Sequence, residues 1–359
     1  MTPAFLGGAE GPSELRTPPF KSLLRRWWRV VEVGGRQPNL AALREKEGRL
    51  FGHAWLKDGG QAWASQSRVR IALDEWATGA LSTWPDDPKV RHPEVGSGRD
   101  IGSHLYLGYG LLTFRQGRTI LDQNVRTSAL ADGVACALTI RTSVDSWSEL
   151  RLDSILSLWA WFGTIGSRAR NGWGSLEVIE DDGLPIDLTS PEALRPFSRD
   201  FNACFDSDWP HALGRDEKGL LIWRTRSDFA SWSEAMKVLA QTKIGFRTRE
   251  SFSWMPSGAS ACGPRHVLAY PVTNHRVQVW ERGGEDTFRL ANQLLFKVLR
   301  IDQGSARRYV GLAVHLPHRL PEPMLEKLDS SSRNKVRGGE RGVWQRIHRH
   351  LDEVMLRWT

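Results

Sequence analysis

Cysteine is scarce in this chain of 359 residues, and the three present, Cys136, Cys204 and Cys262, lie far apart. They form no CxxC pair, which argues against a zinc ribbon and against a disulfide framework. No apolar run reaches the roughly 20 residues that a transmembrane helix needs, and the N-terminus lacks the signal-peptide pattern. We therefore expect a cytoplasmic protein with no membrane span, no metal ligands and no cofactor.

Basic residues exceed acidic ones, with 49 Lys and Arg against 41 Asp and Glu and a formal net charge of +8. This excess favours a polyanionic partner, and a merely basic surface is the competing interpretation. The chain also holds 17 tryptophans. Many of them must be core residues because tryptophan buries a large area, whereas those interleaved with arginine are candidate stacking surfaces for bases.

A glycine-rich stretch at 163–175 follows an apolar helix expected near 148–162 and precedes a short strand expected at 176–179. Glycine permits positive φ and close backbone approach, so such a loop can offer N–H groups and guanidinium groups to phosphates. A solvated connection is the alternative, because the spacing matches neither a Walker loop nor a dinucleotide fingerprint. The candidate residues are Gly163, Gly166, Arg168, Arg170, Gly172, Trp173 and Gly174.

Apolar residues at helical spacing predict an amphipathic helix over 20–31, with basic side chains on another face. Like charges four residues apart repel each other, so this face is expected either to meet an anion or to be solvated. Arginines also alternate on a strand expected at 67–71, and a basic segment with a central aromatic follows at 243–249. These segments supply the candidate nucleic-acid contacts Lys21, Arg25, Arg26, Arg29, Arg68, Arg70, Lys243 and Arg247.

The element pattern predicts an α+β protein with two ferredoxin-like domains side by side, 1–180 and 181–359, joined near an acidic turn at 181–185. In the first half we further expect a helix at 39–47, a long loop at 78–103, and strands at 106–114 and 134–140. For the second half the expected strands are 220–223, 266–272, 277–280, 294–301 and 309–316, with helices at 229–241 and 343–358 and a loop at 317–337.

The N-terminal segment Thr2-Pro-Ala-Phe-Leu-Gly-Gly-Ala9 and the Arg-Trp helix at 21–29 resemble a known signature. They are similar to subunit one of the Cmr complex, a RAMP-superfamily family of the type III-B CRISPR effectors. Further similar motifs follow in the family's order at 50–52, 106–110, 172–176 and 290–298. The family usually carries a full strand before its Thr-Pro, so we expect that strand to be missing here or encoded upstream of Met1.

This resemblance implies two RRM-type domains and a place in a ribonucleoprotein with other Cmr subunits. It implies binding of CRISPR RNA and target RNA near the 3′ end of the guide, in antiviral defence, without catalysis. The alternative is a RAMP-type, metal-independent endoribonuclease that processes precursor CRISPR RNA. Such an enzyme needs a general base, for which His53 and His104 are candidates. A third possibility is a purely structural subunit whose surplus tryptophan contacts neighbouring proteins.

Overall fold

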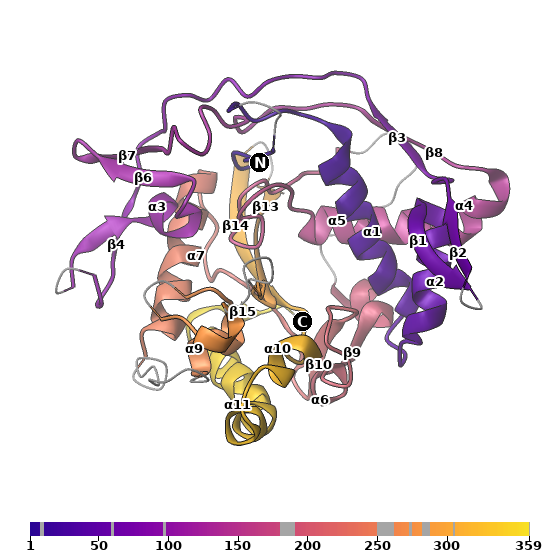
Figure 1. Cartoon of the computed structure of the whole chain (residues 1–359). Helices are drawn as coiled ribbons and strands as arrows, with labels where there is room; N and C mark the ends of the chain where they lie inside the picture. The colour runs from indigo at the N-terminus through magenta and orange to yellow at the C-terminus, as the bar shows by residue number, and fades with distance from the viewer. Residues whose placement is uncertain are drawn as a thin grey trace. The chain divides into compact units, whose positions relative to one another are not determined.

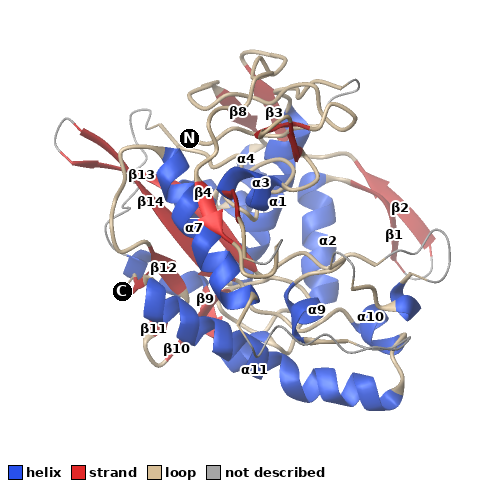
Figure 2. Ribbon diagram, turned by 90° about the vertical axis from the view of Figure 1, so that its left-hand side faces the viewer, coloured by secondary structure: helices blue, strands red, loops and turns tan. Residues whose placement is uncertain are grey.

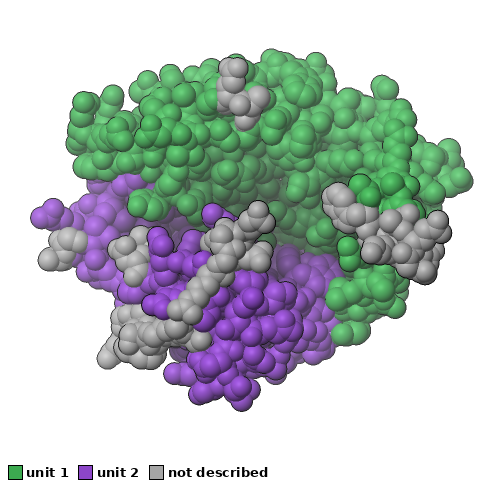
Figure 3. Space-filling model, in the orientation of Figure 1, with its two compact units in different colours: residues 1–86, 108–197, 297–300 green, residues 87–107, 198–296, 301–359 purple. Residues whose placement is uncertain are grey.

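The computed structural model describes residues 1–7, 11–58, 61–95, 98–179, 191–249, 262–272, 275–281, 288–303 and 306–358 (Figure 1). The linker expected at 181–185 lies outside these ranges. Two compact units divide the chain, coloured separately in Figure 3. Unit 1 comprises residues 1–86, 108–197 and 297–300, and unit 2 comprises residues 87–107, 198–296 and 301–359.

The helices of unit 1 form where the sequence gives local signals. Pro18 and Pro19 lie in the first turn of α1 (Thr17–Val33), and Gly34 ends it with φ +54. The apolar face expected on this helix is buried, including Trp27 and Trp28. The other helices of this unit are α2 (Leu40–Phe51), α4 (Val144–Leu150), α5 (Leu152–Phe162) and the 3-10 helix η1 (Pro191–Phe197).

The strands described in unit 1 form antiparallel pairs. These are β1 (His53–Asp58) with β2 (Gln61–Ser65), β3 (Arg70–Leu73) with β8 (Leu138–Arg141), and β6 (Leu112–Arg115) with β7 (Arg118–Leu121). The strand expected at 106–114 is wrong in its first part, where α3 (Ser103–Gly108) forms instead. The strand expected at 176–179 is also wrong, because Leu176 to Ile179 have no regular structure.

Unit 2 is built around a four-stranded sheet in the order β13-β14-β12-β15. The four strands of this sheet and the two long helices follow the chain order β-α-β-β-α-β, and α7 packs on β14 (Figure 2). The strand order also places β12 between β14 and β15, antiparallel to both. The elements are β12 (Ile222–Arg224), α7 (Trp232–Arg247), β13 (Leu294–Gln303), β14 (Ala306–His315), α11 (Ser330–Val354) and β15 (Leu356–Arg357). Residues 297–300, within β13, are counted in unit 1.

Smaller elements complete unit 2, and several differ from the sequence prediction. The expected loop at 78–103 contains an ordered pair, β4 (Lys89–Arg91) with β5 (Asp100–Gly102), and β4 packs on α7. A helix, α9 (Pro264–Leu268), begins where a strand was expected, and the 3-10 helix η2 (Gln278–Trp280) replaces another. The remainder are β9 (Ser198–Asp200), α6 (Phe201–Cys204), β10 (Leu213–Asp216), β11 (Gly219–Leu220) and α10 (Glu322–Glu326).

The tryptophan surplus goes largely into the cores of the two units. Seven tryptophans are among the largest fully buried side chains, namely Trp27, Trp28, Trp161, Trp173, Trp223, Trp280 and Trp344. Large aromatic side chains thus lie at the centre of each unit. The helices and strands described above confirm the mixed α+β class.

Candidate nucleic-acid interface

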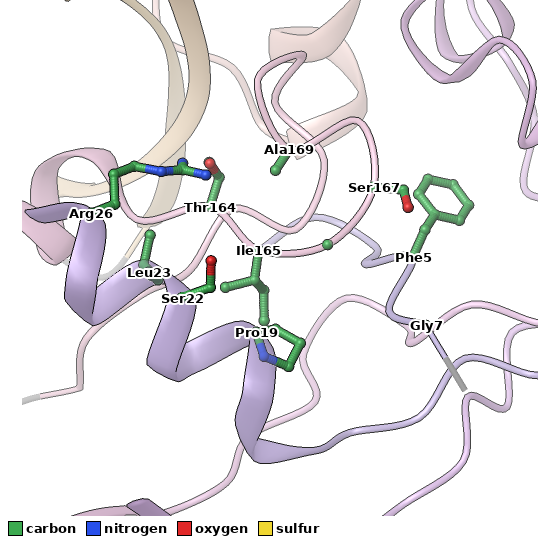
Figure 4. Close-up of a pocket in the computed structure, with 11 residues that line it drawn as sticks. Phe5, Gly7, Pro19, Ser22, Leu23, Arg26, Thr164, Ile165, Ser167 and Ala169 are labelled. Atoms are coloured by element: carbon green, nitrogen blue, oxygen red, sulfur yellow. The ribbon is translucent and has the colours of Figure 1, made fainter. Parts of the chain in front are cut away.

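Helix α1 and the glycine-rich loop line one pocket of about 290 Å³ in unit 1 (Figure 4). Figure 4 shows the Arg26 side chain extending from α1 toward Thr164 of the loop. Two stretches that the sequence singled out separately are thus neighbours in the folded unit. The lining residues are Phe5, Gly7, Pro19, Ser22, Leu23, Arg26, Thr164, Ile165, Gly166, Ser167 and Ala169.

Arg26 is the arginine of the pocket lining, and the charges of Arg29 and Arg170 lie close to it. Burial lowers the pKa of Arg26, and the nearby charge of Arg29 lowers it further. Burial also lowers the pKa of Arg170 to about 10, with the charge of Arg26 adding to the shift. Both groups still carry their charge at neutral pH, so the fold holds half-buried guanidinium groups close together. A bound anion would offset their repulsion and their lost hydration.

The glycine-rich loop uses its glycines for backbone conformations that other residues avoid. Gly166, Gly172 and Gly174 have φ of +89°, +90° and +62°. The glycine pattern predicts positive φ for at least one of Gly172 and Gly174, and both have it. Gly163, in contrast, is extended with φ −63°. At Gly166 an added β-carbon would lie 2.7 Å from the carbonyl oxygen of Phe5, so only glycine fits beside the N-terminal segment.

Residues that the sequence analysis missed hold the two ends of this loop. Lys297, completely buried, donates from Nζ to the carbonyl oxygens of Trp159 and Ala160, at 3.0 and 2.5 Å, where α5 ends. The next residue, Val298, donates its N–H to Ser175 Oγ at 3.0 Å, and Ser175 is the last residue of the loop. The sequence signals were the motif at 290–298, which contains both residues, and a lysine inside an apolar strand, which is expensive to bury unless hydrogen-bonded.

Two of the four basic candidates on α1 are tied to an acid. Arg25 Nε lies 2.8 Å from Glu47 Oε1, and Arg29 Nε lies 2.5 Å from Glu47 Oε2. Glu47, on α2, is only 6% exposed, whereas each arginine side chain is about 40% exposed. Lys21, also half-buried, has its pKa lowered by burial and by the charge of Arg25. The basic face of α1 is therefore partly neutralised within unit 1, and Arg26 is the residue that reaches the pocket.

The pairing of Glu47 predicts a pH-dependent stability. Burial alone would raise the pKa of Glu47, but the hydrogen bonds and charges of Arg29 and Arg25 outweigh it and lower the pKa below 4.5. The unfolded chain then binds this proton more readily, so the contribution is present above pH 4.5 and is lost as pH falls through the folded-state pKa. We expect Glu47→Gln to flatten the unfolding free energy measured between pH 6 and 3, while Glu45→Gln, an exposed neighbour, leaves the curve unchanged.

The remaining basic candidates lie elsewhere on the two units. Arg68 and Arg70 are exposed, and Arg70 lies directly opposite Arg141 in the β3–β8 pair. In unit 2, the ammonium group of Lys243 lies 5.7 Å from the centre of the Tyr106 ring, and both residues are half-buried. Arg247 is close enough for its charge to lower the pKa of His92. None of these residues lines the pocket of Figure 4.

Trp173 does not offer a stacking surface in this structure. Its ring is fully buried, with ring centroids 5.5 Å from Phe5 and 5.3 Å from Trp84. The expectation that a base stacks on Trp173 is corrected accordingly, because no face of the indole reaches solvent. Its neighbours show that it fixes the N-terminal segment against the loop.

His104, one of the two candidate bases, is fully buried in unit 2. Its Nε2 lies 2.9 Å from Ser233 Oγ, and burial lowers its pKa to about 4 despite the opposing charge of Asp87. The other candidate, His53, stacks edge-on to Trp63 at a centroid distance of 3.8 Å in unit 1. Within the described ranges, no group of three or more His, Cys, Asp or Glu side chains could hold a metal ion.

Comparison with known proteins gives two similarities. No family model matches the chain. A curated protein of Pyrococcus furiosus named CRISPR system Cmr subunit Cmr1-2 is 28% identical over 185 residues, which is 50% of this chain and 90% of that protein. A crystal structure of Cmr1 from Pyrococcus furiosus, in its apo form, aligns with a TM-score of 0.42 and 15% identity over 89% of this chain and 87% of the other.

The similarity to Cmr1-2 confirms the resemblance that the sequence motifs indicated. Among the helices that the structure describes, none combines the length and the apolar character that a bilayer crossing requires.

Proposed function

We propose, from the confirmed resemblance to subunit one of the Cmr complex, that this chain is an RNA-binding subunit of a type III-B CRISPR effector. In this proposal it holds guide or target RNA near the guide 3′ end, together with other Cmr subunits, and it does not cut RNA itself. The RNA contact is the pocket between α1 and the glycine-rich loop.

One observation carries the proposal more than any other. Arg26 lines a pocket whose wall also includes Ser22 and the backbone around Gly166, and the like charge of Arg170 lies close to Arg26. Guanidinium groups, a hydroxyl and exposed loop backbone are the groups that bind phosphate oxygens in proteins. No sequence-specific pocket for a base is required, as expected of a subunit that holds RNA of any guide sequence.

The fold of unit 2 is consistent with this role. Its β-α-β-β-α-β order and its sheet order β13-β14-β12-β15 are those of a ferredoxin-like domain, the scaffold of RRM-type proteins. We extend the proposal to two such domains, of which unit 1 would be the more divergent, because its described strands form separate pairs.

The endoribonuclease alternative finds less support. A general base must come within hydrogen-bonding reach of the hydroxyl it deprotonates, and the ring of His104 is completely buried against Trp232 and Ser233. A base whose pKa lies near 4 is also poorly matched to catalysis at neutral pH.

The test replaces Arg26 of the pocket and its neighbour Arg170, as Arg26→Ala with Arg170→Ala, and measures the affinity for a mixed-sequence single-stranded RNA over a range of salt. We expect binding to weaken roughly a hundredfold, since each hydrogen bond to a charged group contributes about 1.5 kcal/mol and 1.4 kcal/mol is tenfold. The slope of log affinity against log salt should fall by about 1.4, at about 0.7 for each lost phosphate contact. We also expect the RNA to remain intact after incubation with the wild-type chain, because the proposed subunit does not cut RNA.

Two controls separate charge from folding. The matched double variant Arg44→Ala with Arg195→Ala removes exposed charges from unit 1 outside the pocket and should leave affinity nearly unchanged. Arg26→Lys with Arg170→Lys keeps both charges and should retain most of the salt dependence. Unchanged RNA affinity in the pocket variant with an intact melting curve would refute the proposal, and cleavage lost in His104→Ala would favour the endoribonuclease.

A further inference from the structure

The β6–β7 hairpin of unit 1 ends in a tight turn with two basic residues at its tip. Gln116 and Gly117 form the turn, with φ of +50° and +78°, the left-handed values that a two-residue hairpin turn requires. The strands on either side pair without irregularity from Leu112–Leu121 to the last pair before the turn. The backbone of the tip is therefore well defined, and it sets the face of the hairpin on which each side chain begins.

Arg115 and Arg118 form that last pair and lie directly opposite each other. Both are exposed, and no ion pair within the described part of the chain joins either one to an acid. Like charges at directly opposed positions destabilise a sheet, so this pair works against the hairpin as long as no anion lies near it. The nearest acid in the chain, Asp122, lies beyond the end of β7 and accepts the N–H of Asn124.

Aromatic side chains accompany the two arginines. Phe114 is 52% exposed and Tyr109, just before the hairpin, is 61% exposed. Both rings are therefore accessible to a ligand at the surface of unit 1. Phe114 precedes Arg115 in β6, so its ring lies on the opposite face of the hairpin from the paired arginines. A single strand of RNA that crosses the tip would place a base on the ring and phosphates against the arginines, the combination with which proteins bind unpaired nucleotides.

The glycine-rich loop reaches the same region. Arg168 has φ +59°, and its Nη2 atom lies 3.1 Å from the position that a β-carbon of Gly110 would take. Gly110 itself has φ +89° and precedes β6 by two residues. The guanidinium group of Arg168, in the glycine-rich loop, therefore lies close to the backbone at the base of the hairpin.

We infer that the tip of the β6–β7 hairpin is a second contact for the single-stranded RNA, with Arg115 and Arg118 binding its phosphates and Phe114 stacking on a base. This inference rests on the proposed function and adds to it a second site on the RNA path. The RNA is unpaired at this point because a duplex would keep its bases away from the exposed ring.

The test is the double charge reversal Arg115→Glu with Arg118→Glu in the full chain. The affinity for a mixed-sequence single-stranded RNA should fall about tenfold, and the salt slope should fall by about 1.4, for two phosphate contacts at about 0.7 each. Both residues are exposed, so the melting temperature should not decrease. Arg44→Glu with Arg195→Glu makes the same change in net charge elsewhere on unit 1 and should leave the affinity within about twofold.

A crosslinking measurement identifies what lies at the tip. With p-benzoylphenylalanine in place of Phe114, irradiation of the assembled complex should join the chain to RNA. A crosslink to another protein subunit instead would overturn the inference and assign the tip to an acidic partner surface. If the wild type binds RNA and the pocket variant does not, while the hairpin reversal binds normally, only this inference fails. If the wild type binds no RNA, the proposed function itself fails.

Discussion

Trp173→Ala is expected to lower the free energy of unfolding of unit 1 by about 3–5 kcal/mol, the usual cost of truncating a large buried aromatic side chain. Trp173 has no exposed surface, and it packs edge-on against both Phe5 and Trp84. The neighbouring backbone is pinned by hydrogen bonds, so the cavity cannot close easily. For a unit of this size the melting temperature should fall by roughly 6–20 °C, measured by calorimetry or circular dichroism.

Trp76→Ala is the matched control, because this tryptophan of the same unit is 67% exposed. Its loss should change the melting temperature by no more than a degree or two, since little packing is removed. Comparable destabilisation by the two substitutions would contradict the buried position of Trp173. A native melting curve for Trp173→Ala with weakened RNA binding would instead restore the stacking role that the sequence suggested.

Gly174→Ala should destabilise unit 1 by about 3 kcal/mol or more, for two reasons that add. A residue with a side chain at φ +62° is strained, which costs about 1–3 kcal/mol. In addition, the new β-carbon would lie 2.0 Å from the carbonyl oxygen of Ile165. Gly174 also donates its N–H to Pro3 and accepts from Ile165, so neither segment can move aside without breaking hydrogen bonds. Urea unfolding monitored by tryptophan fluorescence measures the effect.

Gly133→Ala separates the two contributions. Gly133 has φ +81°, yet no atom lies within 4 Å of the position of an added β-carbon. Only the conformational strain applies there, so we expect a loss of about 1–2 kcal/mol. Equal losses at Gly133 and Gly174 would mean that the contact with Ile165 relaxes at no cost and that the loop is less constrained than its hydrogen bonds indicate.

The sequence predicts best those elements whose signals are local. For α1, apolar spacing, Pro18 and Pro19 at the start and Gly34 at the end all lie within the helix or next to it. The helices near 229–241 and 343–358 were found for the same reason. In β13 and β14, runs of apolar residues long enough to distinguish a strand gave the correct assignment.

Predictions from short apolar runs were wrong because the structure of these segments depends on residues distant in the sequence. The segment after Ser103 reads as a strand, but Asp87 accepts the N–H groups of His104 and Leu105 at 2.7 and 3.0 Å and so starts α3 there. Nothing near the segment in sequence indicates that acceptor. The loop expected at 317–337 also contains the start of α11, which Asp329 caps by accepting the N–H of Ser332.

The sequence predicted the two segments that form the candidate site, but not the contacts that their side chains make. Charge spacing on α1 and the glycine pattern at 163–175 identified both walls of the pocket. The choice of Arg26 over Arg25 and Arg29 depends on Glu47 of another helix, a pairing that spacing along α1 cannot show. Likewise the sequence of the loop does not show that Trp173 points into the core rather than outward.

Unit 1 cannot finish folding until the ribosome has passed Arg300. The glycine-rich loop is complete in sequence by Ser175, but Lys297 and Val298 supply the hydrogen bonds at its two ends. At about 5–20 residues per second, this interval corresponds to roughly 6–25 s of translation. During that time the carbonyl groups at the end of α5 lack the ammonium group of Lys297, and the hydroxyl of Ser175 lacks the N–H of Val298. The pocket is thus assembled late in synthesis, after most of the chain that follows it has emerged.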